Sequence, residues 1–392
     1  MNVLFSYAFR PLFLLATVYA IVVVPLWVGA WLGYLPFPGT LGTPIWWHAH
    51  EMTFGFAGAA VGGFALTAVA TWTARPPVSG ALLLVLSGLW LIARIAFLLP
   101  SPSFLAPAIL ADVGYGALLF ALMGREVISV GNERNYKLLL ILGLLVVSNA
   151  IFFLGVTRSA GWSMTGLHSG LWLIVLLVNL IAGRIIPAFT RNWLKRRAVD
   201  EVKLPPMFDR LDLVSTGLLV AFAIFQVLEA PGRLTALLGL LTSVFLFARL
   251  ARWQGIRARE EPLVWVLHVA YLWLPVGVLL LSLAEIGLIP QTSGIHALTG
   301  GAITTMIVAV ASRAALGHTG RPLESHPVLT ASYALITIAG ICRVAATFGH
   351  AARELLAASA TAWCLGFICF AWRYVPILTQ ARVQRQGSLP AV

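Results

Sequence analysis

The sequence predicts an all-α polytopic membrane protein with about twelve transmembrane helices. Of its 392 residues, 60% are hydrophobic and only 10% are charged, and the mean hydropathy is +0.92. This leaves too little polar surface to cover a water-soluble fold. The apolar runs reach the roughly 20 residues that a helix needs to cross a bilayer, and they are too long for barrel strands. We therefore expect a single transmembrane domain over residues 1–392, with no soluble domain.

Charged residues and prolines divide the chain into twelve candidate spans. Their expected ranges are 9–33, 46–72, 78–99, 104–123, 137–156, 162–187, 210–229, 233–250, 262–286, 292–314, 328–349 and 355–376. The first run lacks the short apolar core and small-residue cleavage site of a secretory signal, so we expect it to be retained as a helix.

The distribution of positive charge predicts the orientation of these spans. The chain carries 26 lysines and arginines and a net charge of +12. With the N-terminus in the cytoplasm, most of them fall on cytoplasmic loops such as Arg191–Arg197 and Arg249–Arg259. This is the positive-inside pattern, and it predicts that both termini are cytoplasmic. We assign the basic loops to topology and to contact with lipid headgroups of the bilayer, and we expect no nucleic-acid partner.

Four of the eight histidines share one predicted depth. His48, His50, His168 and His296 all lie within the first two turns of spans that start on the outer side. Imidazole is a good ligand for haem iron, copper and non-haem iron, which makes these residues candidate metal ligands. Glu51 is a further candidate, either as a ligand, as a hydrogen-bond partner of a ligand imidazole, or as a favourable charge at a helix N-terminus.

His48 and His50 are two positions apart and cannot share one face of a regular helix. We therefore expect one of them to precede the helix. Two further sets of residues each have two interpretations. His268, in the segment LHVAYLW, is either an iron ligand or a hydrogen-bonded core group. Asp112 and Tyr115, one turn apart, either relay protons or form a paired structural group.

An internal repeat relates the second span to the tenth. Residues 50–76 align without gaps with residues 296–322, and matching His, Thr, Gly, Ala, Ala, Thr, Arg and Pro share one offset of 246 positions, as from His50 to His296. After three inserted residues, LIARIAF around Arg94 matches AGICRVAA around Arg343. This self-similarity is typical of a duplicated unit.

The sixth span lies midway between these two, opens with His168 and ends in TRN. A spacing of four helices suggests three pseudo-equivalent four-helix units, which we place at residues 1–123, 124–250 and 251–392. An approximate threefold arrangement would bring the histidine-bearing ends of the second, sixth and tenth spans around one axis. Among the histidines, His50 and His296 rank first as metal ligands because the repeat pairs them, followed by His48 and His168, with His268 in reserve.

Arg94 and Arg343 lie inside the predicted spans. Each is about 16 residues into a helix that starts inside, which is roughly 24 Å at 1.5 Å per residue. An isolated guanidinium within a bilayer is costly, so an anionic partner is expected. Haem propionates, or another buried anion, would provide charge-assisted bonds to both arginines.

Three segments resemble the signature sequences of the NnrS family: WHAHEM at residues 47–52, GRIIPAFTRN at 183–192 and SRAALGHTGRPL at 312–323. The similarity covers essentially the whole chain. The resemblance implies a polytopic bacterial inner-membrane protein that contains haem and copper and is linked to denitrification and to relief of nitric oxide stress. At the level of fold alone, the plan is also similar to the catalytic subunit of haem–copper oxidases and the related nitric oxide reductases.

The chain departs from that second plan at two places. It has no second histidine near His296 for a second haem, and its seventh span has no histidine pair for a copper-type site. Two haems in that arrangement are therefore not expected.

The resulting expectation is a haem and copper membrane metalloprotein that binds nitric oxide and reduces or detoxifies it near the periplasmic side. The haem is expected to be of the b type, and the second metal to be copper or non-haem iron. An oxidoreductase like the nitric oxide reductases would also need a quinol or a separate electron donor. The main alternative is a metal or small-molecule transporter that uses the same histidines, and a third is a structural or regulatory membrane partner.

Overall fold

The structure is a computed structural model that describes residues 3–37 and 39–383. The described residues form an all-helical protein, with twelve helices that are long and apolar enough to cross a membrane. The fold class predicted from the sequence is confirmed, and each of the twelve expected spans is present.

The helices follow one another with short connections, and the second and tenth spans are each built from three consecutive helical segments. The first four spans comprise α1 (Phe9–Trp31), α2 (Pro44–His50) with η2 (Glu51–Ala57) and α3 (Gly58–Thr73), α4 (Ala81–Leu98) and α5 (Leu105–Ser129). The middle four are α6 (Tyr136–Thr157), α7 (Ala160–Arg196), α8 (Arg210–Val227) and α9 (Gly232–Arg252). The last four comprise α10 (Pro262–Glu285), α11 (Gln291–His296) with η7 (Ala297–Ile303) and α12 (Thr304–His318), α13 (Pro327–Ala345) and α14 (Ala352–Thr379). Short 3₁₀ turns precede or connect these helices: η1 (Val3–Ser6), η3 (Pro102–Phe104), η4 (Glu133–Asn135), η5 (Glu201–Lys203), η6 (Gly255–Ala258) and η8 (Ala346–Phe348).

Several helix starts follow from local sequence. At α2, the Thr43 side chain accepts a hydrogen bond from the Trp46 backbone N–H at 3.1 Å, and Pro44 occupies the first turn, where its missing N–H costs nothing. At α8, Asp209 and Asp212 form a capping box. The sixth span is longer than the predicted 162–187, because Pro187 lies inside α7 without ending it. A proline is tolerated inside a membrane-spanning helix because neighbouring helices can satisfy the backbone groups that it leaves free.

Among the described residues, two segments are π-helical, η2 and η7. Both ends of η2 are separated from the corresponding ends of η7 by the 246-residue offset of the sequence repeat. Each contains a glycine at matching positions. A Cβ atom on Gly55 would collide with the Arg94 guanidinium, and one on Gly301 would collide with the Trp273 ring. π-Helical turns are rare and are frequently found at functional sites, so the region around both segments is a candidate functional region.

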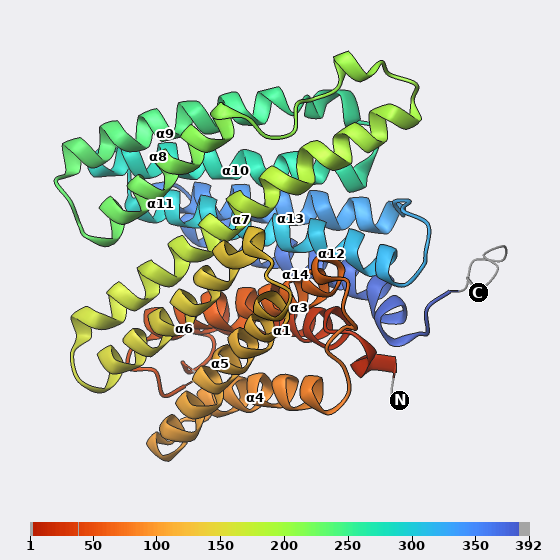
Figure 1. The fold of residues 1–392 in the computed structure, drawn as a ribbon. Coiled ribbons are helices and arrows are strands. Elements are labelled where there is room, and N and C mark those ends of the chain that lie inside the picture. Colours follow the sequence, from red (N-terminus) through yellow and green to blue (C-terminus); the bar gives the residue numbers. More distant parts are fainter. Residues whose placement is uncertain (1–2, 38, 384–392) are drawn as a thin grey trace.

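The helices close into a ring through three contacts between consecutive groups of four. The α5 helix packs against α6, α9 against α10, and α14 against α1. Figure 1 shows α8, α9 and α10 on one side of the bundle and α4, α5 and α6 on the other, with α1 and α14 between them. Inside the ring, α7 contacts both η2 and η7, and α3 contacts α12. The second, sixth and tenth spans therefore meet at the centre.

The start of α1 and the end of α14 lie at the same end of the bundle. The Arg10 guanidinium donates hydrogen bonds to the backbone carbonyls of Leu378 and Gln380, both at 2.7 Å. We call this the terminal end of the bundle.

Candidate functional site: a histidine-lined cavity beside a buried ionic network

A cavity of about 680 Å³ lies where the second, sixth and tenth spans meet. Its volume is in the range of about 300–1,000 Å³ that ligand-binding pockets occupy. Three of the predicted histidines line it, His48 from α2, His168 from α7 and His296 from α11, together with Arg343 from α13. Most of the remaining wall is apolar.

The cavity lies at the end of the bundle opposite the terminal end. Its wall includes Trp31 at the end of α1, and Ile45, Met164 and Thr292 at the starts of α2, α7 and α11. The α7 wall is a single helix face, because Met164, Leu167, His168 and Leu171 follow the helical repeat. Side chains from three separate parts of the sequence thus enclose one space.

The three histidines of the cavity have different surroundings. The His48 ring stacks on Trp27 with a centroid separation of 4.3 Å, and its buried Nδ1 atom has no hydrogen-bond partner among the described residues. The Nε2 atom of His296 contacts the Nη2 group of Arg343. His168 faces the same space from α7. A buried imidazole nitrogen without a protein partner is unusual, and it makes His48 a candidate for a partner from outside the chain.

His50, although only two residues from His48, is not among the described residues that line this cavity. The expectation that one of the two histidines precedes the helix is wrong, because both lie in α2. Their side chains leave the helix on different faces. The His50 ring is fully buried, with Nδ1 3.0 Å from Oε1 of Glu51 and Nε2 3.0 Å from Oδ1 of Asn149. Both ring nitrogens are therefore engaged by oxygen atoms of the chain itself.

A buried ionic network surrounds His50, and we call it the His50 network. Its members come from five spans and are Tyr19, His50, Glu51, Arg94, Asp112 and Asn149. The Tyr19 hydroxyl donates to Glu51, and the Nη1 group of Arg94 lies 3.3 Å from Oε1 of the same carboxylate. Arg94 also forms an ion pair with Asp112. The anions that face Arg94 are thus two carboxylates of the chain.

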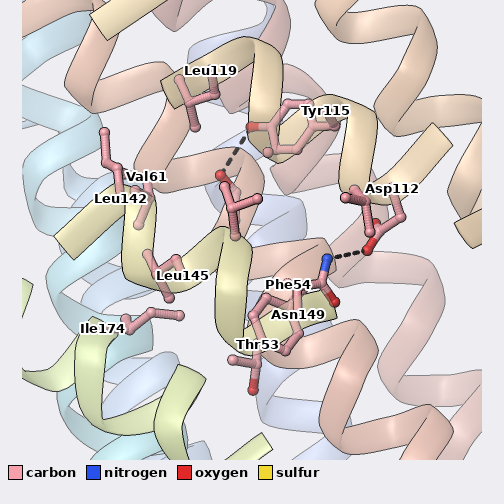
Figure 2. A pocket seen from close by; sticks show the side chains of 14 residues that line it. Thr53, Phe54, Val61, Asp112, Tyr115, Leu119, Leu142, Leu145, Asn149 and Ile174 are labelled. Atoms are coloured by element: carbon pink, nitrogen blue, oxygen red, sulfur yellow. Dashed lines mark hydrogen bonds between the residues drawn. The ribbon is translucent and has the colours of Figure 1, made fainter. Parts of the chain in front are cut away.

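A second cavity, of about 50 Å³, borders this network (Figure 2). It is large enough for a few water molecules at most. The Asn149 amide donates to Asp112 at 2.6 Å, and the Tyr115 hydroxyl donates to the backbone carbonyl of Gly58 at 3.0 Å. Asp112 is therefore a paired group inside the network, and Tyr115 is held by backbone. Thr53 lines both this small cavity and the large one.

His268 also lies away from the large cavity. It is 8% exposed, and its Nε2 atom is 2.9 Å from the hydroxyl of Thr190 on α7. Nearby, four side chains form a further polar cluster, which we call the Arg249 network. Arg249 donates to Asp212 at 2.7 Å, to Asn179 at 2.6 Å and to Tyr271 at 3.0 Å. Contacts between α7, α8, α9 and α10 are fixed by these bonds.

Sequence reasoning did not single out Asn149, Tyr19 or the methionines Met52 and Met164 of the large cavity. Asn149 had a usable signal, because it is a lone amide in the apolar segment KLLLILGLLVVSNAIFF. A polar side chain in such a span is expected to face a partner inside the bundle. The methionines had no such signal, since Met is common in apolar cores.

Within the part of the chain that the structure describes, no three His, Cys, Asp or Glu side chains are grouped around one possible ion position. His48, His168 and His296 line the cavity, but the three do not form such a group. This arrangement suits a ligand that fills the cavity and meets individual imidazoles at its surface.

Comparison of the sequence with known proteins and protein families identifies one family. No match to the chain is found among curated proteins. The sequence model of one family, described as NnrS protein, matches residues 3–382. Because this match covers nearly the whole chain, the chain belongs to the NnrS family.

Proposed function

We propose that this protein binds a haem-type cofactor in the large cavity and handles nitric oxide there, by binding and by reduction or detoxification. The observation that carries the proposal is the convergence of His48, His168 and His296, from three different spans, on one cavity of about 680 Å³. Membership in the NnrS family, a family of the nitric oxide response, supports the same function.

The residues present fit a haem. A haem would need only one or two imidazoles from the protein, so it does not require three ligating side chains around one ion position. The buried and unpartnered Nδ1 of His48 is one such group, and His168 and His296 are the others. The apolar wall, with its tryptophans at Trp27 and Trp363, is suited to a flat ring.

Copper is also compatible with this donor set. Met52 and Met164 line the same cavity as the three histidines. Soft sulfur ligands together with imidazole favour copper, whereas non-haem iron prefers imidazole with carboxylate. Glu51, the carboxylate nearest in sequence, is engaged in the His50 network.

Nitric oxide is small and uncharged, so an apolar cavity admits it without a desolvation cost for charged groups. A bound haem or copper would supply an open coordination position and one-electron chemistry. The chain's own contribution is to hold the group with imidazoles and to exclude water with apolar walls. Reduction would further require electrons from a quinol or a separate protein donor.

Variants of the histidines to glycine test the proposal. Each is purified with and without added imidazole and measured for haem spectrum, copper content and helicity. Loss of haem in the His48, His168 or His296 variants, reversed by imidazole, is the expected result, because exogenous imidazole refills the cavity and restores ligation. His268→Gly is the matched control. Wild-type spectra and metal content in all three cavity variants would overturn the assignment. Haem and metal absent from gently purified wild-type protein would favour the transporter alternative.

We further propose that the protein lies in the bacterial inner membrane with both termini cytoplasmic, which places the large cavity on the periplasmic side. The positive-inside distribution of lysine and arginine supports this orientation. Because the cavity lies opposite the terminal end, it would then be on the periplasmic side. Reporter fusions at the C-terminus test it. If a reporter that is active only in the periplasm is active when fused to the C-terminus, the proposed orientation is wrong.

A further inference from the structure

The paired histidine and arginine have different surroundings in the two copies of the sequence repeat. The 246-residue offset pairs His50 with His296, and after the three-residue insertion Arg94 pairs with Arg343. In the first copy, the histidine and the arginine lie inside the sealed His50 network. In the other copy, His296 and Arg343 contact each other and line the large cavity.

The acidic partners of the first copy have no counterparts in the second. Glu51, which contacts both His50 and Arg94, corresponds to Ala297. Asp112 lies on α5, and its counterpart helix α14 has no acidic residue between residues 355 and 379. Among the described residues, no carboxylate forms an ion pair with Arg343.

The aromatic side chains that close the first copy are missing from the second as well. The rings of Phe54 and Phe97 lie 5.2 and 5.3 Å from the His50 ring, and Trp90 lies 5.7 Å from the Arg94 guanidinium. At the corresponding positions the chain has three small residues, Gly300, Ala346 and Ala339. All three small residues line the large cavity. Part of the cavity is thus the space that aromatic rings fill in the first copy.

We propose that Arg343, which lies beside His296, forms a subsite for the carboxylate of a ligand whose apolar body lies in the space beside Gly300, Ala339 and Ala346. A guanidinium inside a membrane protein requires an anion, and in the first copy the chain supplies it through Glu51 and Asp112. In the second copy the anion comes from the ligand, through charge-assisted hydrogen bonds. The subsite goes beyond the proposed function, because it requires a carboxylate on the ligand and no metal.

The carboxylate has two possible sources, a carboxylated macrocycle or a fatty acid from the bilayer. Three fluorescent probes separate them: metal-free protoporphyrin IX, its dimethyl ester and cis-parinaric acid. The ester keeps the ring and removes both negative charges. The purified protein is titrated in detergent with each probe, and any pigment that it already carries is followed by displacement. Tighter binding of protoporphyrin IX than of parinaric acid identifies the macrocycle, and the reverse order identifies the fatty acid.

Two variants address the subsite directly. Arg343→Gln removes the positive charge, and Ala297→Glu places a carboxylate at the position that Glu51 has in the first copy. Each variant is expected to weaken binding of the free-acid probe by about tenfold or more, the equivalent of one lost charge-assisted hydrogen bond, and to leave binding of the ester unchanged. Arg353→Gln is the matched control, because Arg353 lines the same cavity but is exposed and donates to the Tyr34 hydroxyl at 2.9 Å.

Equal affinity of the wild-type protein for the acid and the ester would overturn the proposal, as would unchanged acid binding in Arg343→Gln. Far-UV circular dichroism reports the folding of each variant, and if Ala297→Glu does not fold, Arg343→Gln decides. Because the probes carry no metal, selectivity for the acid stands or falls separately from haem binding and nitric oxide handling.

Discussion

The Nε2 atom of His50 on α2 lies 3.0 Å from the Oδ1 atom of Asn149 on α6. The Asn149 amide nitrogen donates in turn to Asp112 at 2.6 Å, so this orientation of the amide directs its oxygen at the imidazole. Asn149 thereby joins the first four spans to α6, which is the fifth span. Its role is to satisfy buried polar groups where two groups of helices meet.

Asn149→Leu should destabilise the protein without removing a cofactor from the large cavity. The change removes the amide's bonds to His50 and Asp112 and leaves His50 Nε2 and Asp112 Oδ2 with only their own 3.3 Å contact. Each buried group that loses its hydrogen bond costs about 1–3 kcal/mol. Thermal unfolding in detergent measures the loss, and the haem content of the folded fraction is the second readout. Thr157→Val is a control, because Thr157 on the same helix bonds only to local backbone carbonyls. A stable Asn149 variant that has lost its haem would contradict this role.

Thr190→Val tests the assignment of His268. The hydroxyl of Thr190 is the polar partner of His268 Nε2, so its removal should lower the free energy of unfolding by the cost of one unsatisfied buried group, about 1–3 kcal/mol. The unfolding temperature measures this loss. The haem spectrum should stay that of the wild type, because His268 is not on the cavity wall. A changed spectrum in a normally stable variant would instead return His268 to the candidate iron ligands.

Arg249→Met should be among the most destabilising substitutions. It leaves the buried Asp212 carboxylate with less compensation and also removes donors to Asn179 and Tyr271. Breaking a buried ion pair from one side costs about 3–5 kcal/mol. Arg252→Met is the matched control. Arg252 also pairs with Asp212 but is 17% exposed, so solvent can replace part of its contribution. Equal unfolding temperatures for the two variants would contradict the central position of Arg249.

Asp209 gives a pH dependence outside the spans. The hydrogen bond from Arg252 holds the pKa of the Asp209 carboxyl below its ordinary value, and the Leu211 backbone N–H acts in the same direction. A lowered pKa contributes stability above the unfolded value of about 4, and this contribution is lost as the pH falls through the folded value.

Asp209→Ala should therefore cost about 1 kcal/mol at neutral pH, the value of a helix N-cap, and less below about pH 4. Unfolding temperatures measured from pH 7 to pH 3 follow this difference. Asp209→Asn keeps a capping side chain without the charge, and it should lie between the wild type and the alanine variant at neutral pH. A difference that grows on acidification would contradict the sign.

Much of the architecture could be predicted from the sequence because the relevant forces act locally along the chain. A span must be long and apolar to satisfy its backbone in lipid, and this requirement can be recognised one segment at a time. The repeat also located positions that the structure treats as corresponding, including both ends of the two π-helical segments. The extension of α7 beyond Pro187 was not predicted, because neighbouring helices decide whether a proline ends a helix.

The burial and the hydrogen-bond partners of individual site residues depend on neighbours that are distant in sequence. His48 and His50 share one short helix, yet one reaches the cavity and the other meets Asn149 from α6. The paired residues Arg94 and Arg343 occupy corresponding positions, but only the first has carboxylates of the chain beside it. The sequence alone determined that this is a membrane protein of twelve spans, with imidazoles and guanidiniums inside the spans. Tertiary structure decided which of them are sealed and which face open space, because burial and pairing are properties of contacts between helices.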